Sequence, residues 1–491
     1  MKLTTYMATL GLLLGAAAVS GQTPIEINPP APAGTSAVPE TPAPPKVSST
    51  GAPVVTYGLQ SAITRGLEKF PGLDIARKAT EIAETDLAQA KHSWFIPSFS
   101  VTSLFGPVPD VPASAGPPTF ASVDQNLSGD DGVFFRAEFE ALQPLFTFGR
   151  LRNLTKLARV GVKASQQDEK DQLHELVYNI KRVYFGLAAL NTIEAFLTEI
   201  ELKLGFVEKR IEIMLAKGAS DVTESDRHKV QIFKADLQNR QYETKENQLK
   251  LRQAMALLLG YGDQIDSWDL DATNINKMDA ESFDLDQVLT WVRNNNPQLK
   301  RLQYLVDAKK HLYNIAQANT LPVFFLGGTF RYAVAPDRYD VNNPFLVDEF
   351  NEVTGGVALG LKQDLSLHLL RDRYIKARVE WEQAQFQQNL AQSAIISDVR
   401  SKFVSADFTA KRLDVTIEGL RAARSWVGAE LNNYEFGLTP TKDVLEAFIA
   451  YAKTKLDFID ATVKYNLAIS TLTRVAFREL LPIHYNGDGR S

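Results

Sequence analysis

The stretch LEKFPGLDIARKATEIAETDLAQAKHSWFIPSFSV, residues 67–101, has a counterpart in VRNNNPQLKRLQYLVDAKKHLYNIAQANTLPVFFL, residues 292–326. In each, a proline is followed two residues later by leucine, a helical stretch runs to a second proline, and an alternating segment comes next. The turn KGASDVTES near Gly218 reappears as FGLTPTKDV near Gly437, so the repeat period is close to 220 residues. A period of this length indicates a duplicated domain rather than a short-repeat solenoid.

Two proline-free spans predict very long helices. Proline is absent from Leu145 to Asn296 and from Phe345 to Thr439, and proline breaks helices more strongly than any other residue. Within both spans apolar residues recur every three or four positions, which is typical of a coiled-coil seam. A helix of roughly 65 residues would be about 100 Å long. The seam residues are Leu176, Ile180, Val183, Leu187, Leu190, Ile193, Leu197, Ile200, Leu204, Val207, Ile211 and Met214 in the first span, and Ile396, Val399, Phe403, Ala406, Ala410, Leu413, Ile417, Leu420, Val427, Leu431 and Tyr434 in the second.

Four alternating segments predict strands, at about 98–106, 132–142, 323–333 and 354–363. In the second of them Phe135, Ala137 and Phe139 fall on one side, and Arg136 and Glu138 on the other. An apolar and a polar face with period two is typical of transmembrane barrel strands, although a soluble hairpin packed on helices has the same pattern. Because four strands cannot close a barrel and open edges are not tolerated in lipid, the barrel interpretation requires oligomerisation.

Composition narrows the class of protein further. The chain has 491 residues, no cysteine, and a net charge of −5, which excludes disulfides and thiolate metal sites and argues against nucleic-acid binding. Residues 1–21 have the pattern of a secretory signal peptide, and residues 22–54 are a proline-rich leader predicted to be disordered. No further stretch of 18 apolar residues predicts a membrane-spanning helix. An exported chain without disulfides fits a bacterial periplasm or outer membrane.

No motif predicts catalysis or a cofactor. The six histidines are scattered without metal-ligand spacing, and neither a phosphate-binding glycine loop nor a nucleophile motif is present. The histidines are His92, His174, His228, His311, His368 and His484. We therefore expect no enzyme activity, no metal and no cofactor.

Two segments carry a resemblance to a known family. They are NNPQLKRLQYLVDAKKHLYNIAQANTLPVFFLGGTFRY, residues 295–332, and NNYEFGLTPTKDVLEAFIAYAKTKLDFIDATVKYNLAISTL, residues 432–472. Together with the signal peptide and the duplication, they resemble the TolC-like outer-membrane efflux family. The resemblance implies a first repeat at 55–278, a second at 279–480 and a tail at 481–491.

What the family resemblance implies is a mainly α fold with a transmembrane β-barrel. Each protomer would duplicate a helix-strand-strand-helix-helix unit, and a homotrimer would form one twelve-stranded barrel in outer-membrane lipid, continued through the periplasm by a long α-helical coiled-coil barrel. Such a channel is a passive duct of a tripartite efflux or type I secretion system. It docks to a periplasmic adaptor protein and an inner-membrane transporter.

The resemblance also assigns roles around the two helix turns. Gly218 and Gly437 are expected to end helices in the left-handed conformation, with Thr439 as N-cap and Pro440 in the first turn of the next helix. In the family these turns form the periplasmic tip that contacts the adaptor. Well-known members have an arginine at the position of Thr439, so a closed-state latch at that position is not expected here.

Four further residues complete the expected gate. By resemblance, Tyr434 bonds to Glu224 in the closed state, although Tyr434 also continues the apolar seam as a core residue would. Asp443 and Glu446, three residues apart, share one helix face and match the family's acidic constriction. The alternative is that both carboxylates complement the helix dipole, which explains Asp443 better than Glu446.

Two other classes of protein stay open on the sequence. One is a structural coiled-coil stalk or adhesin of the cell envelope, and the other is an exported enzyme. The sequence does not distinguish drugs, metal ions and proteins as exported cargo.

Overall fold

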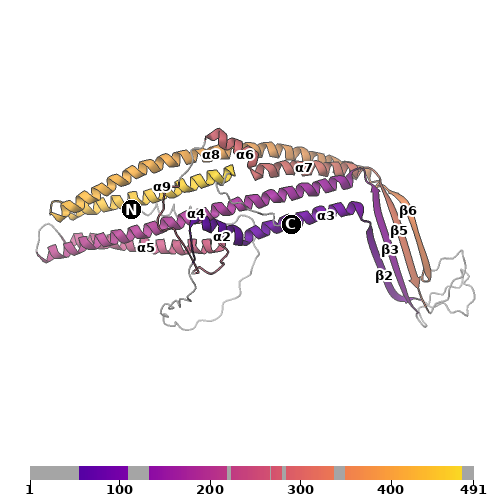
Figure 1. The fold of residues 1–491 in the computed structure, drawn as a ribbon, viewed down its shortest axis with the longest axis horizontal. Helices are drawn as coiled ribbons and strands as arrows, with labels where there is room; N and C mark the ends of the chain where they lie inside the picture. The colour runs from indigo at the N-terminus through magenta and orange to yellow at the C-terminus, as the bar shows by residue number, and fades with distance from the viewer. Residues whose placement is uncertain are drawn as a thin grey trace, which may run out of the picture. The chain divides into compact units, whose positions relative to one another are not determined.

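The computed structural model describes residues 55–108, 132–217, 223–265, 267–278, 284–336 and 349–477. One order of elements occurs twice: two helices, two strands, a very long helix and a further helix (Figure 1). The first set is α2 (Leu59–Lys69), α3 (Pro71–Phe95), β2 (Ser98–Val108), β3 (Gly132–Phe146), α4 (Arg150–Ala216) and α5 (Glu224–Leu258). The second set is α6 (Leu285–Asn295), α7 (Pro297–Ala318), β5 (Val323–Val334), β6 (Glu352–Lys362), α8 (Leu367–Glu435) and α9 (Thr441–Ala476). Two short strands, β1 (Val55–Tyr57) and β4 (Trp268–Leu270), pair in parallel.

The two matching prolines divide each pair of leading helices. Phe70 and Asn296, directly before Pro71 and Pro297, are both extended with ψ of 116°, because proline disfavours the helical conformation in the residue before it. Each proline then begins the next helix, where its missing N–H costs no hydrogen bond.

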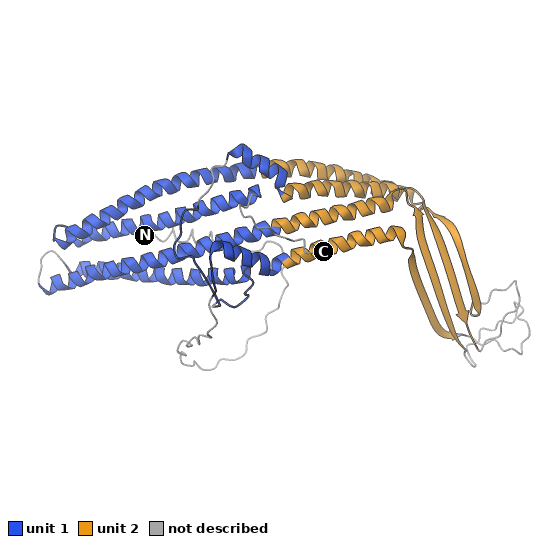
Figure 2. Ribbon diagram, in the orientation of Figure 1, with its two compact units in different colours: residues 1–73, 172–296, 396–491 blue, residues 74–171, 297–395 orange. Residues whose placement is uncertain are grey.

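The chain forms two compact units (Figure 2). The first comprises residues 1–73, 172–296 and 396–491, and the second comprises residues 74–171 and 297–395. In the first unit the predicted seam of α4 is the core: every seam residue from Leu176 to Ile211 is buried, and Met214 packs against the core. The prediction of this coiled-coil seam is confirmed.

The α8 seam is buried less completely. Val399, Leu413 and Val427 are buried, whereas Phe403 and Ile417 are only half-buried. By length and composition α4 could also cross a membrane, but 61% of its most apolar window is buried inside the protein. We therefore treat α4 as a core helix.

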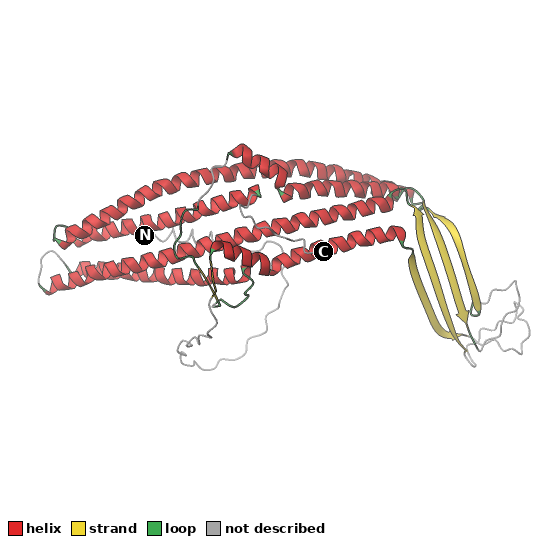
Figure 3. Cartoon of the chain, in the orientation of Figure 1, coloured by secondary structure: helices red, strands yellow, loops and turns green. Residues whose placement is uncertain are grey.

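The second unit contains a four-stranded antiparallel sheet with the order β2-β3-β5-β6 (Figure 3). Register places Val101 beside Phe139, Phe139 beside Phe330, and Phe330 beside Gly355. The strands lie on the four alternating segments, and β3 extends to Phe146, beyond the predicted end at 142. A single chain thus supplies a four-stranded sheet, which is no closed barrel.

Candidate functional site

The turn between α8 and α9 is built around Gly437. Its φ is +71°, its N–H bonds the carbonyl of Tyr434, and the N–H of Leu438 bonds the carbonyl of Asn433. These two bonds form a Schellman motif, which favours glycine because the residue is left-handed. The predicted role of Gly437 as a helix C-terminal glycine is confirmed. The turn leaves Phe436 and Leu438 exposed, at 79% and 75% of their surface.

The start of α9 differs from the prediction. Its N-cap is Pro440, with ψ of 155°, and no side chain caps the helix, so Thr439 as N-cap and Pro440 as a first-turn residue are both wrong. Thr441 is instead the first helical residue, and its buried hydroxyl lies 3.3 Å from that of Tyr434. Pro440 at the cap fixes the direction in which the backbone enters α9. The contact between Thr441 and Tyr434 joins the start of α9 to the end of α8.

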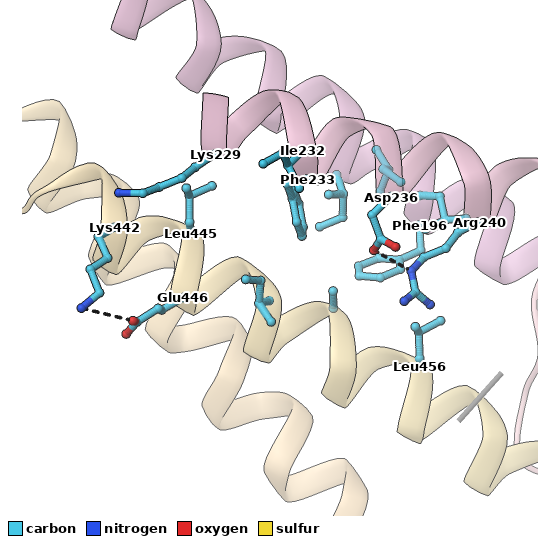
Figure 4. Close-up of a pocket in the computed structure, with 15 residues that line it drawn as sticks. Phe196, Lys229, Ile232, Phe233, Asp236, Arg240, Lys442, Leu445, Glu446 and Leu456 are labelled. Carbon is cyan, nitrogen blue, oxygen red and sulfur yellow. Dashed lines mark hydrogen bonds and ion pairs between the residues drawn. The ribbon is translucent and has the colours of Figure 1, made fainter. Parts of the chain in front are cut away.

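The predicted constriction residues lie in the first turns of α9. Asp443 is half-buried in the first turn, and Glu446 is exposed one turn further on. Lys442 lies 3.7 Å from the Glu446 carboxylate, so part of that negative charge is balanced locally. Glu446 and Lys442 both line a groove of about 730 Å³ between α5 and α9, opposite Lys229 (Figure 4).

The predicted partners Tyr434 and Glu224 are not bonded to each other in the described chain. Tyr434 is buried against Thr441, whereas exposed Glu224 pairs with Arg227 at 3.1 Å. Gly218, the glycine of the other turn, lies outside the described residues.

A capping box begins α5 after that other turn. The N–H and hydroxyl of Thr223 both donate to a carboxylate oxygen of Asp226, at 3.1 and 2.8 Å, which satisfies donors that the helix start would leave free. Burial raises the pKa of Asp226, but hydrogen bonds from Lys229 and Thr223 outweigh it and hold this pKa below its ordinary value.

The sheet of the second unit has one apolar and one polar face. Phe135, Ala137 and Phe139 share their face with Val101 and Val357, as the register shows. The shared apolar face is largely exposed, and Val357 has 76% of its surface open.

The opposite face of the sheet carries ion pairs between strands. Arg331 on β5 lies 3.0 Å from Glu138 on β3 and 3.7 Å from Glu352 on β6. The predicted division of apolar and polar residues between the two faces is confirmed.

Sequence reasoning missed Arg210 on α4. Its guanidinium donates a 2.8 Å hydrogen bond to the main-chain carbonyl of Glu435 and lies over the Tyr434 ring, 5.5 Å from the centroid. The only sequence signal is a cation beside the seam residue Ile211, which many surface positions share. Among the described residues, no group of three or more His, Asp or Glu side chains is placed to hold a metal ion.

Comparison with known proteins identifies the class. Residues 288–476 match the family described as outer membrane efflux protein. No curated protein sequence matches the chain significantly.

Solved structures share the fold across most of the chain. The outer membrane protein VceC of Vibrio cholerae has a TM-score of 0.66 and 16% identity, covering 85% of this chain and 95% of that one. The CmeC outer membrane channel of Campylobacter jejuni has a TM-score of 0.67 and 15% identity, covering 85% of each chain. The open state of the MtrE outer membrane channel of Neisseria gonorrhoeae has a TM-score of 0.67 and 14% identity, covering 85% and 88%.

The duplicated helices, the two-faced sheet and these matches give the chain the fold of an outer-membrane channel protomer. Residues 288–476 match the outer membrane efflux proteins, so the resemblance found in the sequence is confirmed. The matched family and the shared fold indicate an efflux channel of the outer membrane with its helical part in the periplasm, and that family is one of channels rather than enzymes.

Proposed function

We propose that three copies of this chain assemble into one passive export duct. Their sheets would join into a twelve-stranded barrel in outer-membrane lipid, and their helices would continue it as a coiled-coil barrel in the periplasm. Energy for export would come from an inner-membrane transporter, because the chain offers no nucleotide-binding motif.

The sheet is the observation that carries this proposal. Its apolar face is exposed, and its outer strands β2 and β6 have no further strand beside them among the described residues. Open strand edges cannot persist in hydrocarbon because each unpaired N–H and carbonyl would cost several kcal/mol, on the order of a lost hydrogen bond or more. Pairing β2 of one copy with β6 of the next removes every open edge.

An unpaired helix seam supports the same assembly. On α8, Val404, Phe408 and Val415 are exposed at spacings of four and seven residues, which is a heptad pattern on a face that the described part of the chain leaves open. Such a stripe packs against another helix. The second copy required by the sheet would supply that helix.

We place the adaptor contact at the tip turns, around Gly218 and Gly437 with Thr439 and Pro440. Phe436 and Leu438 give the described turn two exposed apolar side chains for a periplasmic adaptor protein, which in turn would hold the inner-membrane transporter. Nucleic acid is not expected as a partner, because the chain has a net charge of −5.

The entrance of the duct is assigned to Asp443 and Glu446. Two carboxylates from each of three chains would give a ring that favours cations and repels anions, weakened by Lys442 beside Glu446. We propose Tyr434 and Glu224 as closing residues of the gate. Their bond would require Glu224 to leave Arg227, and the Tyr434 hydroxyl to turn from Thr441.

Conductance in planar lipid bilayers tests the function. The purified protein is expected to give discrete single-channel current steps without any added nucleotide. A correctly assembled protein that gives no current contradicts the duct and favours the alternative, a structural coiled-coil stalk or adhesin of the envelope.

A further inference from the structure

All four strands of the sheet join a helix at the same end of the sheet (Figure 3). Helix α3 leads into β2 and α7 into β5, while β3 leads into α4 and β6 into α8. The proposed barrel turns this end toward the periplasm, because its helices continue there. The surface at these junctions would therefore meet the inner boundary of the outer membrane.

Phe148, in the turn between β3 and α4, extends the apolar face of the sheet. Its ring centroid lies 4.7 Å from that of Phe146 and 6.4 Å from that of Phe324. Alternation from Phe330 puts Phe324 on the apolar face, where it pairs with Leu361. The backbone of Phe148 is left-handed, with φ of +49°, a conformation that is rare for an aromatic residue. This turn leaves the ring 39% exposed at the helix end of the apolar face.

An arginine follows Phe148 in the first turn of α4, and the second repeat has the same pair. Arg152 is exposed four residues after Phe148, and Arg371 is exposed four residues after Leu367. Leu367 itself is the first residue of α8 and has 62% of its surface open. The two pairs are 219 residues apart, which matches the repeat period. The duplication thus places an exposed apolar side chain and an exposed arginine at both strand-to-helix junctions.

Basic residues at these two helix starts are not balanced by acids. Residues 150–167 of α4 contain five Lys and Arg residues and no carboxylate, and residues 367–379 of α8 contain four with a single acid, Asp372. The helix dipole opposes cations at a helix start, so it does not account for this excess. A negatively charged membrane surface beside the helix starts does account for it, because such a surface attracts nearby cations.

We propose that two pairs of residues, Phe148 with Arg152 and Leu367 with Arg371, bind anionic phospholipids of the periplasmic leaflet of the outer membrane. This inference rests on the proposed function, which sets these junctions at the membrane boundary. The two apolar side chains contact acyl chains beside the strand ends, and the two guanidinium groups reach the phosphates beyond them. The occupant is lipid rather than protein because Phe148 is continuous with the apolar face that the barrel turns to lipid.

Fluorescence quenching in lipid vesicles tests the proposal. The carbonyl of Trp94 lies 2.8 Å from the Gln143 side chain on β3, and Trp94 is 43% exposed, so this residue should report lipid near the junctions. The assembled protein is reconstituted in phosphatidylcholine with brominated acyl chains, which quench tryptophan on contact, and the signal is the quenching lost in Trp94→Phe. Unbrominated phosphatidylglycerol or phosphatidylcholine is then added, and the lipid that binds more tightly restores more fluorescence.

Wild type is expected to prefer the anionic phosphatidylglycerol by about fivefold, the factor that one arginine contributes at an anionic surface. In the double variant Arg152→Gln, Arg371→Gln this preference should disappear. The matched control is the double variant Arg159→Gln, Arg378→Gln. It removes the arginines that lie two helical turns, about 10 Å, further along the same helices, and it should keep the wild-type preference.

The outcomes separate the lipid site from the duct. A wild-type protein that assembles but neither conducts nor shows quenching of Trp94 overturns both. A conducting wild type without that quenching, or with equal displacement by the two lipids, overturns the lipid site alone, and so does a preference that both double variants keep or lose equally. If the first double variant does not assemble, wild type decides: the preference should fall at about 1 M salt, which screens surface charges, and an unchanged preference overturns the proposal.

Discussion

The ring of Phe325 on β5 lies against the backbone of Gly360 on β6, so closely that a methyl group on Gly360 would overlap it. Both residues are on the polar face of the sheet, which the proposed barrel turns toward its lumen. The absence of a side chain at Gly360 therefore lets an aromatic ring lie flat on this face. A ring in that position would leave the lumen of the proposed barrel open.

Gly360→Ala is expected to lower single-channel conductance because the new methyl group forces the Phe325 ring away from the sheet. Gly356→Ala is the control, since Gly356 lies on the same face of the same strand with open space around it. Unchanged conductance in Gly360→Ala, together with a stability loss of about 1–3 kcal/mol from overpacking, would mean that the ring stays in place.

Adjacent residues on β6 test which face meets lipid. Arginine at Val357, exposed on the apolar face, should cost about 2–4 kcal/mol near the bilayer midplane, whereas arginine at the next residue, Ala358, should be tolerated. Urea titration of the protein folded into lipid vesicles measures both. Greater damage from Ala358→Arg than from Val357→Arg would invert the assignment of the faces.

The double variant Asp443→Asn, Glu446→Gln tests the entrance. It should lose selectivity for cations and block by the trivalent cobalt hexammine ion, because the negative ring is removed. Lys442→Gln serves as the opposite control and should increase cation selectivity by freeing Glu446 from its 3.7 Å partner. Equal block and selectivity in the wild type and the double variant would leave both carboxylates as complements of the helix dipole.

Asp226 gives a pH-dependent prediction. Its pKa is lowered in the folded protein, so its capping contribution is fully present above the ordinary value of 3.8 and is lost as the pH falls through the lowered pKa. At neutral pH, Asp226→Asn should lower the free energy of opening of the first turn of α5 by about 1 kcal/mol. Hydrogen exchange of the backbone amides in this turn measures that free energy.

The neighbouring carboxylate Glu224 is the control for Asp226. It pairs with Arg227 at the surface, where ion pairs contribute little to stability. Glu224→Gln should therefore change the free energy of opening measured by hydrogen exchange by at most about a few tenths of a kcal/mol. Equal effects of the two substitutions would show that simple charge at the helix start, rather than the capping box, protects this turn.

Periodicity predicted the helices and strands of this fold because the local spacing of apolar residues determines which of the two forms. The α4 seam and the two faces of the sheet follow from spacings of three, four and two residues, and Gly437 follows from the left-handed turn that it permits. Proline placement located the helix starts at Pro71 and Pro297.

Contacts between distant segments could not be predicted in this way. Arg210 and Glu435 are 225 residues apart, and no periodicity relates them. The cap of α9 was misassigned to Thr439 because threonine is normally a better cap than proline, whereas Pro440 takes the N-cap position and no side chain caps the helix.

The number of chains per particle tests most directly whether three copies of the chain assemble into one barrel. Because each chain supplies four strands with two open edges, mass measurement of the protein in mild detergent should give three chains per particle, with no stable monomeric barrel. A monomer that keeps its strand content in detergent would contradict the account.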